Sequence, residues 1–173
     1  VIYGLLLIVS VSIFAYFFLD HVKNRIESFL GNADTYQIDL SLEAFKSGGI
    51  LGKGPGQGDL KEKMPDANTD FIFAVAGEEL GLIFCLIILI IILSIILKTL
   101  INVLKIQDPY KIIAISGLVC SFGLQSLINI FSSLGIIPTK GMTLPFVSYG
   151  GSSMIAVSIL FGFLLSLTNK NNE

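Results

Sequence analysis

Long hydrophobic segments and polar segments follow one another along this chain. Four uncharged apolar runs, each long enough to cross a bilayer, occupy residues 1–19, 80–97, 112–134 and 147–168. Eighteen helical residues rise about 27 Å, close to the roughly 30 Å hydrocarbon core of a membrane. Because backbone groups inside lipid must pair with one another, we expect each run to be a transmembrane helix.

The composition supports a membrane location. Hydrophobic residues make up 53% of the 173 residues and charged residues only 14%, whereas a soluble domain has about 25% charged residues. No basic stripe is present, so nucleic acid is not expected as a partner. Cys85 and Cys120 fall inside apolar runs, far in sequence from His21, and we expect them to pack or to face lipid. We predict an all-α membrane protein, a polytopic helical bundle fragment with four transmembrane helices and a long structured extracytoplasmic loop.

The lysines of the short loops orient the bundle. Three lysines fall within the connection 98–111 and one, Lys140, within the connection 135–146. The cytoplasmic side of a membrane protein carries the excess of basic residues, so residues 98–111 are predicted to be cytoplasmic. The other polar segments follow by alternation: the tail at 169–173 is cytoplasmic, and the segments 20–79 and 135–146 face outward.

The outward segment 20–79 holds eleven of the thirteen acidic residues. Within it, Ile38, Leu42 and Phe45 recur at helical spacing, which predicts a short amphipathic helix at the surface. The stretch 48–58 is rich in glycine, which implies turns and close backbone approach. It lacks the lysine and hydroxyl pattern of a phosphate-binding loop, so we interpret it as a structured turn between two surface segments.

The last third of this segment carries the richest pattern of polar residues. Asn68 or Thr69 is suited to cap a helix, which would place Asp70 in the first turn, where the helix dipole favours a carboxylate. Asp70 also stands at the boundary between water and membrane, where a carboxylate can take a proton from a lipid-anchored substrate. Both interpretations stay open. Glu78 and Glu79 point about 100° apart on a helix, so one is expected to face the interior and pair with a base.

The outer connection before the last run contains a single charge. Lys140 is either a side chain that reaches the membrane interface or a cation that binds phosphate. The small residues 150–153 allow close helix packing. On the third run, Ser116, Gln125 and Asn129 are polar positions that we expect to lack full partners within this chain.

Two long motifs give the chain a family resemblance. Residues 65–75 (PDANTDFIFAV) with 78–81 (EELG), and residues 138–146 (PTKGMTLPF) with 148–153 (SYGGSS), resemble the two outer-loop signatures of the SEDS family. The second motif, together with residues 52–56 (GKGPG), is similar to the cell-division members rather than the elongation members. The chain departs from the family pattern at Asn68, where His is usual.

The resemblance implies a function. SEDS proteins polymerise lipid II into glycan strands on the outer face of the bacterial cytoplasmic (inner) membrane, and the cell-division members do so at the septum. They work with a class B penicillin-binding protein transpeptidase and other division proteins. The resemblance implies that Asp70 is the catalytic carboxylate and general base. Lys140, Glu79, Thr69 and Ser148 are the accompanying candidates for binding substrate, and a divalent cation, Mg or Mn, is the candidate cofactor.

Two other classes of function stay open from the sequence. The first is a flippase or transporter of the lipid-linked precursor, although transporters keep ionisable groups near the membrane midplane and the four runs hold none. The second is a scaffold that only recruits a penicillin-binding protein. The chain resembles the C-terminal part of a SEDS protein, without the earlier spans, and we expect the segment alone to be inactive.

Overall fold

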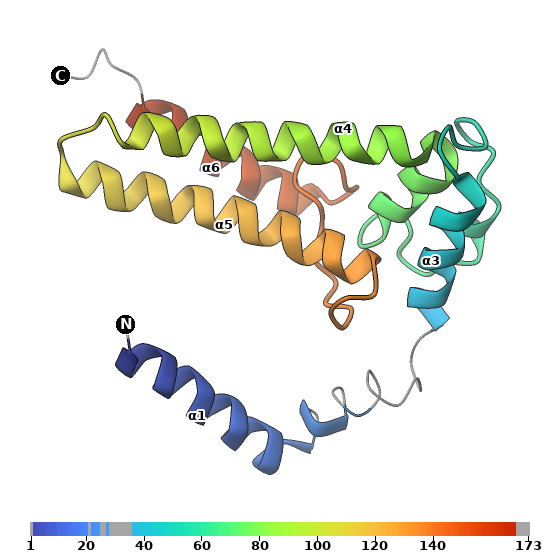
Figure 1. The fold of residues 1–173 in the computed structure, drawn as a ribbon, viewed down its shortest axis with the longest axis horizontal. Coiled ribbons are helices and arrows are strands. Elements are labelled where there is room, and N and C mark those ends of the chain that lie inside the picture. Colours follow the sequence, from blue (N-terminus) through green and yellow to red (C-terminus); the bar gives the residue numbers. More distant parts are fainter. Residues whose placement is uncertain (1, 21, 25–26, 28–35, 169–173) are drawn as a thin grey trace. The chain divides into compact units, whose positions relative to one another are not determined.

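A computed structural model describes most of the chain as helices joined by loops (Figure 1). It describes residues 2–20, 22–24, 27 and 36–168; the predicted tail at 169–173 and part of the predicted segment 20–79 lie outside these residues. Within them the elements are, in order, α1 (Ile2–Phe18), α3 (Tyr36–Gly48), a 3₁₀ turn (Leu60–Glu62), α4 (Ile72–Val103), α5 (Pro109–Ser133) and α6 (Gly151–Thr168). This described part contains no strand, which confirms the all-α prediction.

Three of these helices, α4, α5 and α6, are long and apolar enough to cross a membrane. They correspond to the second, third and fourth predicted spans. The first predicted span corresponds to α1, an uncharged helix of 17 residues that belongs to a separate compact unit, residues 1–37. Whether α1 also crosses the membrane stays a prediction.

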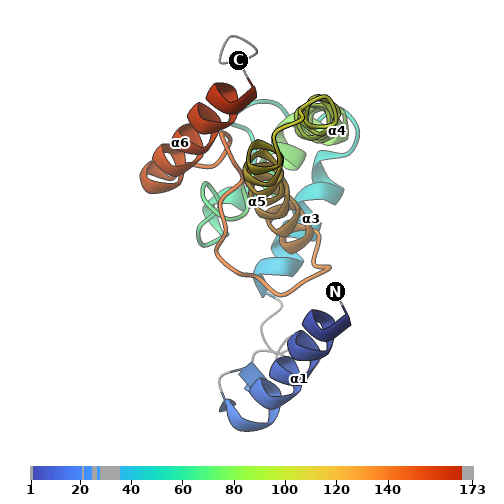
Figure 2. The same cartoon turned by 90° about the vertical axis from the view of Figure 1, so that its left-hand side faces the viewer.

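The second compact unit, residues 38–173, is built around α5. α5 packs against both α4 and α6, as the view along the helices in Figure 2 shows. Ile115 and Val119 of α5 form one buried cluster with Val103 and Leu164. Many other large apolar side chains of these helices are exposed, as expected for faces that meet lipid rather than protein.

Two helices, α4 and α5, extend beyond the predicted apolar runs, whereas α6 begins at Gly151, four residues into its run. α4 continues past Lys98 to Val103 because a lysine can carry its charge to the polar interface while its backbone stays helical. α5 starts at Pro109 instead of residue 112, and the carboxylate of Asp108 caps it by accepting from the N–H of Tyr110 at 2.9 Å. Hydropathy therefore located the spans but not the ends of the helices.

α3 confirms the predicted surface helix. Of its predicted apolar face, Ile38 is buried and Leu42 and Phe45 are half-buried. A neighbouring buried cluster joins α3 to the segment that leads into α4, and it contains Leu40, Ala44, Leu60, Met64, Ala67, Phe71, Ala74 and Val75. Ser41 adds a polar tie, since its buried hydroxyl donates to the carbonyl of Ser133 at the end of α5, at 2.5 Å.

α4 is broken at Gly81, which has φ 80° and ψ −179°. In an unbroken helix the N–H groups of Leu82 and Ile83 would donate to the carbonyls of Glu78 and Glu79. The break separates these four groups. Unpaired main-chain groups in a buried setting are costly, so each one needs another partner.

The glycine-rich stretch supplies all four partners from residues 49–54. The donor and acceptor pairs are Leu82 N–H to Gly49 O (3.0 Å), Ile83 N–H to Ile50 O (3.4 Å), Lys53 N–H to Glu78 O (3.0 Å) and Gly54 N–H to Glu79 O (2.9 Å). The loop thus replaces the missing helical bonds. This confirms the structured turn that the sequence predicts.

Close backbone approach explains the glycines at the break. A Cβ on Gly81 would lie 2.4 Å from the N of Gly52 and from the O of Ile50. A Cβ on Gly52 would lie 2.3 Å from the O of Glu79. Both glycines also have positive φ, where a side chain is strained.

Glu78 and Glu79 both pair with lysines of the loop. The Glu78 side chain is fully buried, contacts Lys53 Nζ at 2.8 Å and accepts from the N–H of Asp59 at 3.1 Å. Glu79 is half-buried, contacts Lys61 Nζ at 2.8 Å and also accepts from a loop N–H. The predicted interior acid with a basic partner is therefore Glu78, and its neighbour is paired as well.

We predict that Gly81→Ala destabilises the full-length protein by at least about 2 kcal/mol. The reason is left-handed strain of roughly 1–3 kcal/mol together with a clash against the loop backbone. Gly117→Ala is the matched control, because a Cβ added to Gly117 inside α5 would meet nothing within 4 Å, and alanine should stabilise the helix there by about 0.5–1 kcal/mol. Thermal unfolding in detergent measures both. Equal melting temperatures for the two variants would contradict the close approach.

We also predict that Lys53→Met lowers the melting temperature more than Lys61→Met. The first change leaves the fully buried carboxylate of Glu78 without its cation, whereas the second affects the half-buried Glu79. The same unfolding assay tests this order. A larger effect of Lys61→Met would show that the Glu78 pair is not the one that holds the loop.

Candidate functional site

Two loops meet at one end of the bundle, the turn before α4 and the connection between α5 and α6. Three consecutive carbonyls of the first loop each accept a hydrogen bond from the C-terminal part of the chain. These bonds are Tyr149 N–H to Asn68 O (2.9 Å), Ser148 Oγ to Thr69 O (2.5 Å) and Asn129 Nδ2 to Asp70 O (2.8 Å). The two segments that were predicted to face outward therefore share one end of the bundle.

The local structure around Asp70 differs from the predicted helix cap. α4 begins at Ile72, and its N-cap position is Phe71, which makes no side-chain capping bond. The carbonyl of Asp66 organises the preceding turn instead, since it accepts from the N–H of Asp70 at 2.9 Å and from the hydroxyl of Thr69 at 3.0 Å. The predictions of a cap at position 68 or 69, and of Asp70 in the first helical turn, are therefore wrong.

Asp70 is half-buried, and its carboxylate lies beside Gly141 of the second loop. A Cβ added to Gly141 would lie 3.2 Å from Asp70 Oδ2, so a side chain there would push the carboxylate by a few tenths of an ångström. The positive φ of 57° also favours glycine at this position. Burial raises the pKa of Asp70, and the negative charge of Asp66 raises it further. The direction is opposite to that expected from a helix dipole, because burial is the largest influence on this pKa.

The other candidate residues fall into different environments. Thr69 is tied into the turn by its own hydroxyl. Ser148 is almost fully buried, and its hydroxyl both donates to Thr69 O and accepts from the N–H of Leu144 at 2.7 Å. Lys140 is exposed, and no described residue forms an ion pair with it. Glu79 belongs to the glycine-rich loop contacts rather than to this site. Direct binding of substrate by these four residues stays a prediction.

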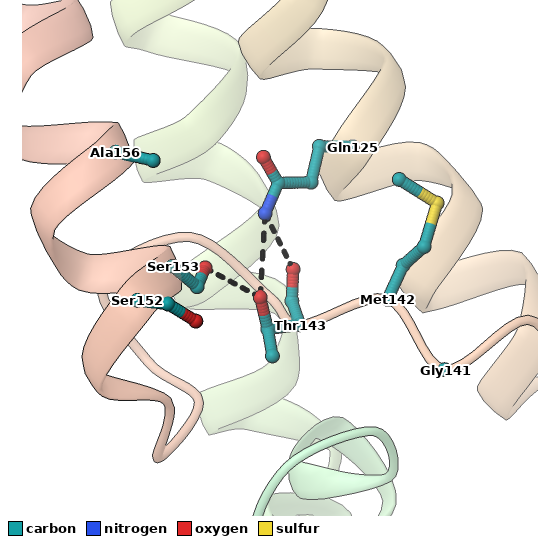
Figure 3. A pocket seen from close by; sticks show the side chains of 7 residues that line it. All are labelled: Gln125, Gly141, Met142, Thr143, Ser152, Ser153 and Ala156. Carbon is teal, nitrogen blue, oxygen red and sulfur yellow. Dashed lines mark hydrogen bonds between the residues drawn. The ribbon is translucent and has the colours of Figure 1, made fainter.

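An open pocket of about 530 Å³ adjoins the second loop and is shown in Figure 3. Gln125 points from α5 toward Thr143, donating to its carbonyl at 3.0 Å, and the Thr143 hydroxyl contacts that of Ser153 on α6 at 2.6 Å. The pocket is lined by uncharged residues, namely Gln125, Gly141, Met142, Thr143, Ser152, Ser153 and Ala156. Asp70 does not line the pocket, but its carboxylate lies near Gly141, which does, so it stands close to the edge of the pocket.

The polar face of α5 is more fully paired than expected. Gln125 and Asn129 both donate to main-chain carbonyls of the second loop, and only the Oδ1 atom of Asn129 is buried without a partner among the described residues. The sequence indicated polar positions here but could not show that they hold loops. Their spacing of four residues, which places both amides on one face of a helix, was the available signal.

Comparison with known proteins adds independent information. Residues 1–173 match the family model described as cell cycle protein, which groups FtsW, RodA and SpoVE. The "Probable peptidoglycan glycosyltransferase FtsW" of Caulobacter vibrioides is 46% identical over 157 residues, 90% of this chain and 40% of that protein. The protein of the same name from Borreliella burgdorferi is 44% identical over 156 residues, 86% of this chain and 42% of that protein. The "Peptidoglycan glycosyltransferase RodA" of Mycobacterium bovis is 35% identical over 174 residues, 98% of this chain and 37% of that protein.

These relatives are longer proteins. The chain spans about two fifths of the length of each of them. Their names therefore describe whole proteins, of which this chain corresponds to one part.

We predict that Asp66→Asn lowers the pKa of Asp70. The substitution removes a neighbouring negative charge that disfavours ionisation, while asparagine tolerates the positive φ of 56° and keeps the carbonyl that organises the turn. An infrared titration of the carboxylate in the full-length protein measures the shift, with the exposed Glu43→Gln as control. An unchanged or raised pKa would contradict the effect of the Asp66 charge on Asp70.

Proposed function

The chain belongs to the SEDS family of FtsW and RodA proteins, and on that premise we propose that the protein it belongs to polymerises lipid II into peptidoglycan glycan strands. The observation that carries this proposal is the Asp70 carboxylate, half-buried at the edge of an open pocket at one end of the bundle. The printed names of the relatives, which are peptidoglycan glycosyltransferases, support the same reaction.

Asp70 acts as the general base in this proposal. The sugar hydroxyl of the acceptor gives its proton to the Asp70 carboxylate, and the oxygen forms a bond to the anomeric carbon of the donor. The bond between that carbon and the lipid pyrophosphate breaks, and the pyrophosphate leaves with the electron pair. A pKa raised by burial makes the Asp70 carboxylate a stronger base.

In this proposal, the sugar and the pyrophosphate of the substrate bind to different parts of the site. The pocket beside Asp70 offers hydroxyl and amide groups but no charged side chain, which suits a sugar rather than a pyrophosphate. Lys140 lies next to Gly141 in the chain and is exposed, and in this proposal its ammonium group offsets phosphate charge.

A divalent cation fits this site only with the help of the substrate. In the part of the chain that the structure describes, no three His, Cys, Asp or Glu side chains gather to hold a metal ion. An Mg or Mn ion would therefore be held by Asp66 or Asp70 together with phosphate oxygens of the substrate. When bound, it would supply positive charge for the leaving pyrophosphate.

The setting follows from the family and from the helices. We propose four spans, including α1, in the bacterial cytoplasmic membrane, with the Asp70 end facing outward. The higher identity to FtsW proteins, 46% and 44% against 35% for RodA, favours a role at the division septum. The proposed partners are a class B penicillin-binding protein transpeptidase and other division proteins.

In the full-length protein, Asp70→Asn should lower the rate of glycan polymerisation about 10²–10⁴-fold, because an amide cannot take the proton from the acceptor hydroxyl. The assay uses purified lipid II and the protein together with its transpeptidase partner. Glu43→Gln, an exposed acid on α3, is the matched control and should keep the wild-type rate. Polymerisation by the Asp70 variant at the wild-type rate would remove Asp70 from this role.

The same preparations separate the enzyme from a transporter. A lipid II translocation assay in proteoliposomes is run beside the polymerisation assay. Polymerisation that depends on Asp70 without translocation supports the glycosyltransferase, whereas translocation without polymerisation would replace it with the flippase.

A further inference from the structure

One buried side chain of α5 contacts both loops of the site. Asn129 is 1% exposed, and its Nδ2 donates to Asp70 O at 2.8 Å and to Met142 O at 2.6 Å. Both amide hydrogens are therefore used, one on the residue that carries the carboxylate and one on the loop that lines the pocket. We propose that Asn129 is a positioning residue that holds Asp70 at a fixed separation from the pocket.

The geometry of an amide makes this a rigid connection. The two N–H bonds of a primary amide lie in one plane and diverge at a fixed angle, so the two carbonyls they bind are held at a set distance. Met142 directly follows Gly141, which faces the Asp70 carboxylate. The side chain of Asn129 thus sets the distance between the proposed base and the wall of the pocket.

Ser148 makes a similar connection between the two loops at Thr69, the residue before Asp70. Its hydroxyl donates to Thr69 O and accepts from the N–H of Leu144. Asn129 thus binds the main chain of Asp70, and Ser148 binds that of Thr69. Each of them also binds a main-chain group of the second loop. Gln125, one helical turn before Asn129, holds Thr143 but forms no hydrogen bond to residues 68–70, so it braces only the pocket side (Figure 3).

The unpaired oxygen of Asn129 argues against a role in packing alone. Its Oδ1 atom is buried and accepts no hydrogen bond from the described residues, which is unfavourable in a buried setting. A leucine of similar size would avoid this cost and fill the same space. The presence of an amide at this position is therefore best explained by its two N–H groups, because they hold the two loops together.

The test uses the full-length protein with its transpeptidase partner and measures initial polymerisation rates over a range of lipid II concentrations. Because the inference rests on the proposed function, Asp70→Asn is assayed in parallel. Asn129→Leu should lower kcat at least about tenfold, since misplacement of a catalytic group by about 1 Å can cost 10²-fold. KM should stay within about twofold, because substrate binding groups remain.

Ser126→Ala is the matched control. Ser126 is fully buried one turn before Asn129, and its hydroxyl bonds only to Phe122 O within α5. This variant should keep the wild-type kcat. A loss of kcat in Ser126→Ala equal to that in Asn129→Leu would assign the effect to any buried polar change in α5 and overturn the inference.

Ser148 provides a second arm should Asn129→Leu fail to fold. Ser148→Ala should lower kcat with KM unchanged, and Ser148→Thr, which keeps the hydroxyl, should restore it. A raised KM in Ser148→Ala would instead mean direct contact with substrate and would overturn positioning at this residue. The inference would be overturned if Asn129→Leu and Ser148→Ala both kept the wild-type kcat while Asp70→Asn was inactive. That result would leave the proposed function standing. An active Asp70→Asn would overturn the proposed function itself.

Discussion

The break in α4 at Gly81 is the constraint on which the Asp70 end of this bundle depends. A helix that stops pairing for one turn leaves two carbonyls and two N–H groups without partners, and a buried backbone cannot tolerate that. Residues 49–54 take up all four groups. The glycine-rich loop therefore completes the hydrogen bonding of α4. The ion pair between the buried Glu78 and the half-buried Lys53 lies directly beside this junction.

The same junction supports the segment that carries Asp70. The first turns of α4, before the break, pack with α3 and the 3₁₀ turn in one buried cluster, which includes Phe71. The cluster therefore anchors the residues that follow Asp70. The hydrogen bonds of Asn129 and Ser148 hold the carbonyls of Asp70 and Thr69 from the other side. The Asp70 side chain is half-buried in this position, and burial raises the pKa of its carboxylate.

Sequence patterns predicted what depends on composition and periodicity. They located three helices that can span a membrane, the surface helix α3, the structured glycine turn and the basic partner of a buried acid. They failed where one tertiary contact decides the outcome. Asn68 and Thr69 look like helix caps, but the carbonyl of Asp66 organises the turn and delays the helix to Ile72. The contact of Asp70 with the loop around Gly141 and the pairing of the Asn129 amide with Met142 both depend on tertiary packing, which no local pattern reveals.

Residue-resolved amide hydrogen exchange on the full-length protein in detergent tests the junction most directly. If the loop completes the broken helix, the amides of Lys53 and Gly54 exchange as slowly as those of Leu82 and Ile83, because all four belong to one set of hydrogen bonds. Rapid exchange of Lys53 and Gly54 beside slow exchange of Leu82 and Ile83 would mean that α4 is continuous and pairs within itself. That result would contradict the account of how the Asp70 end of the bundle is held.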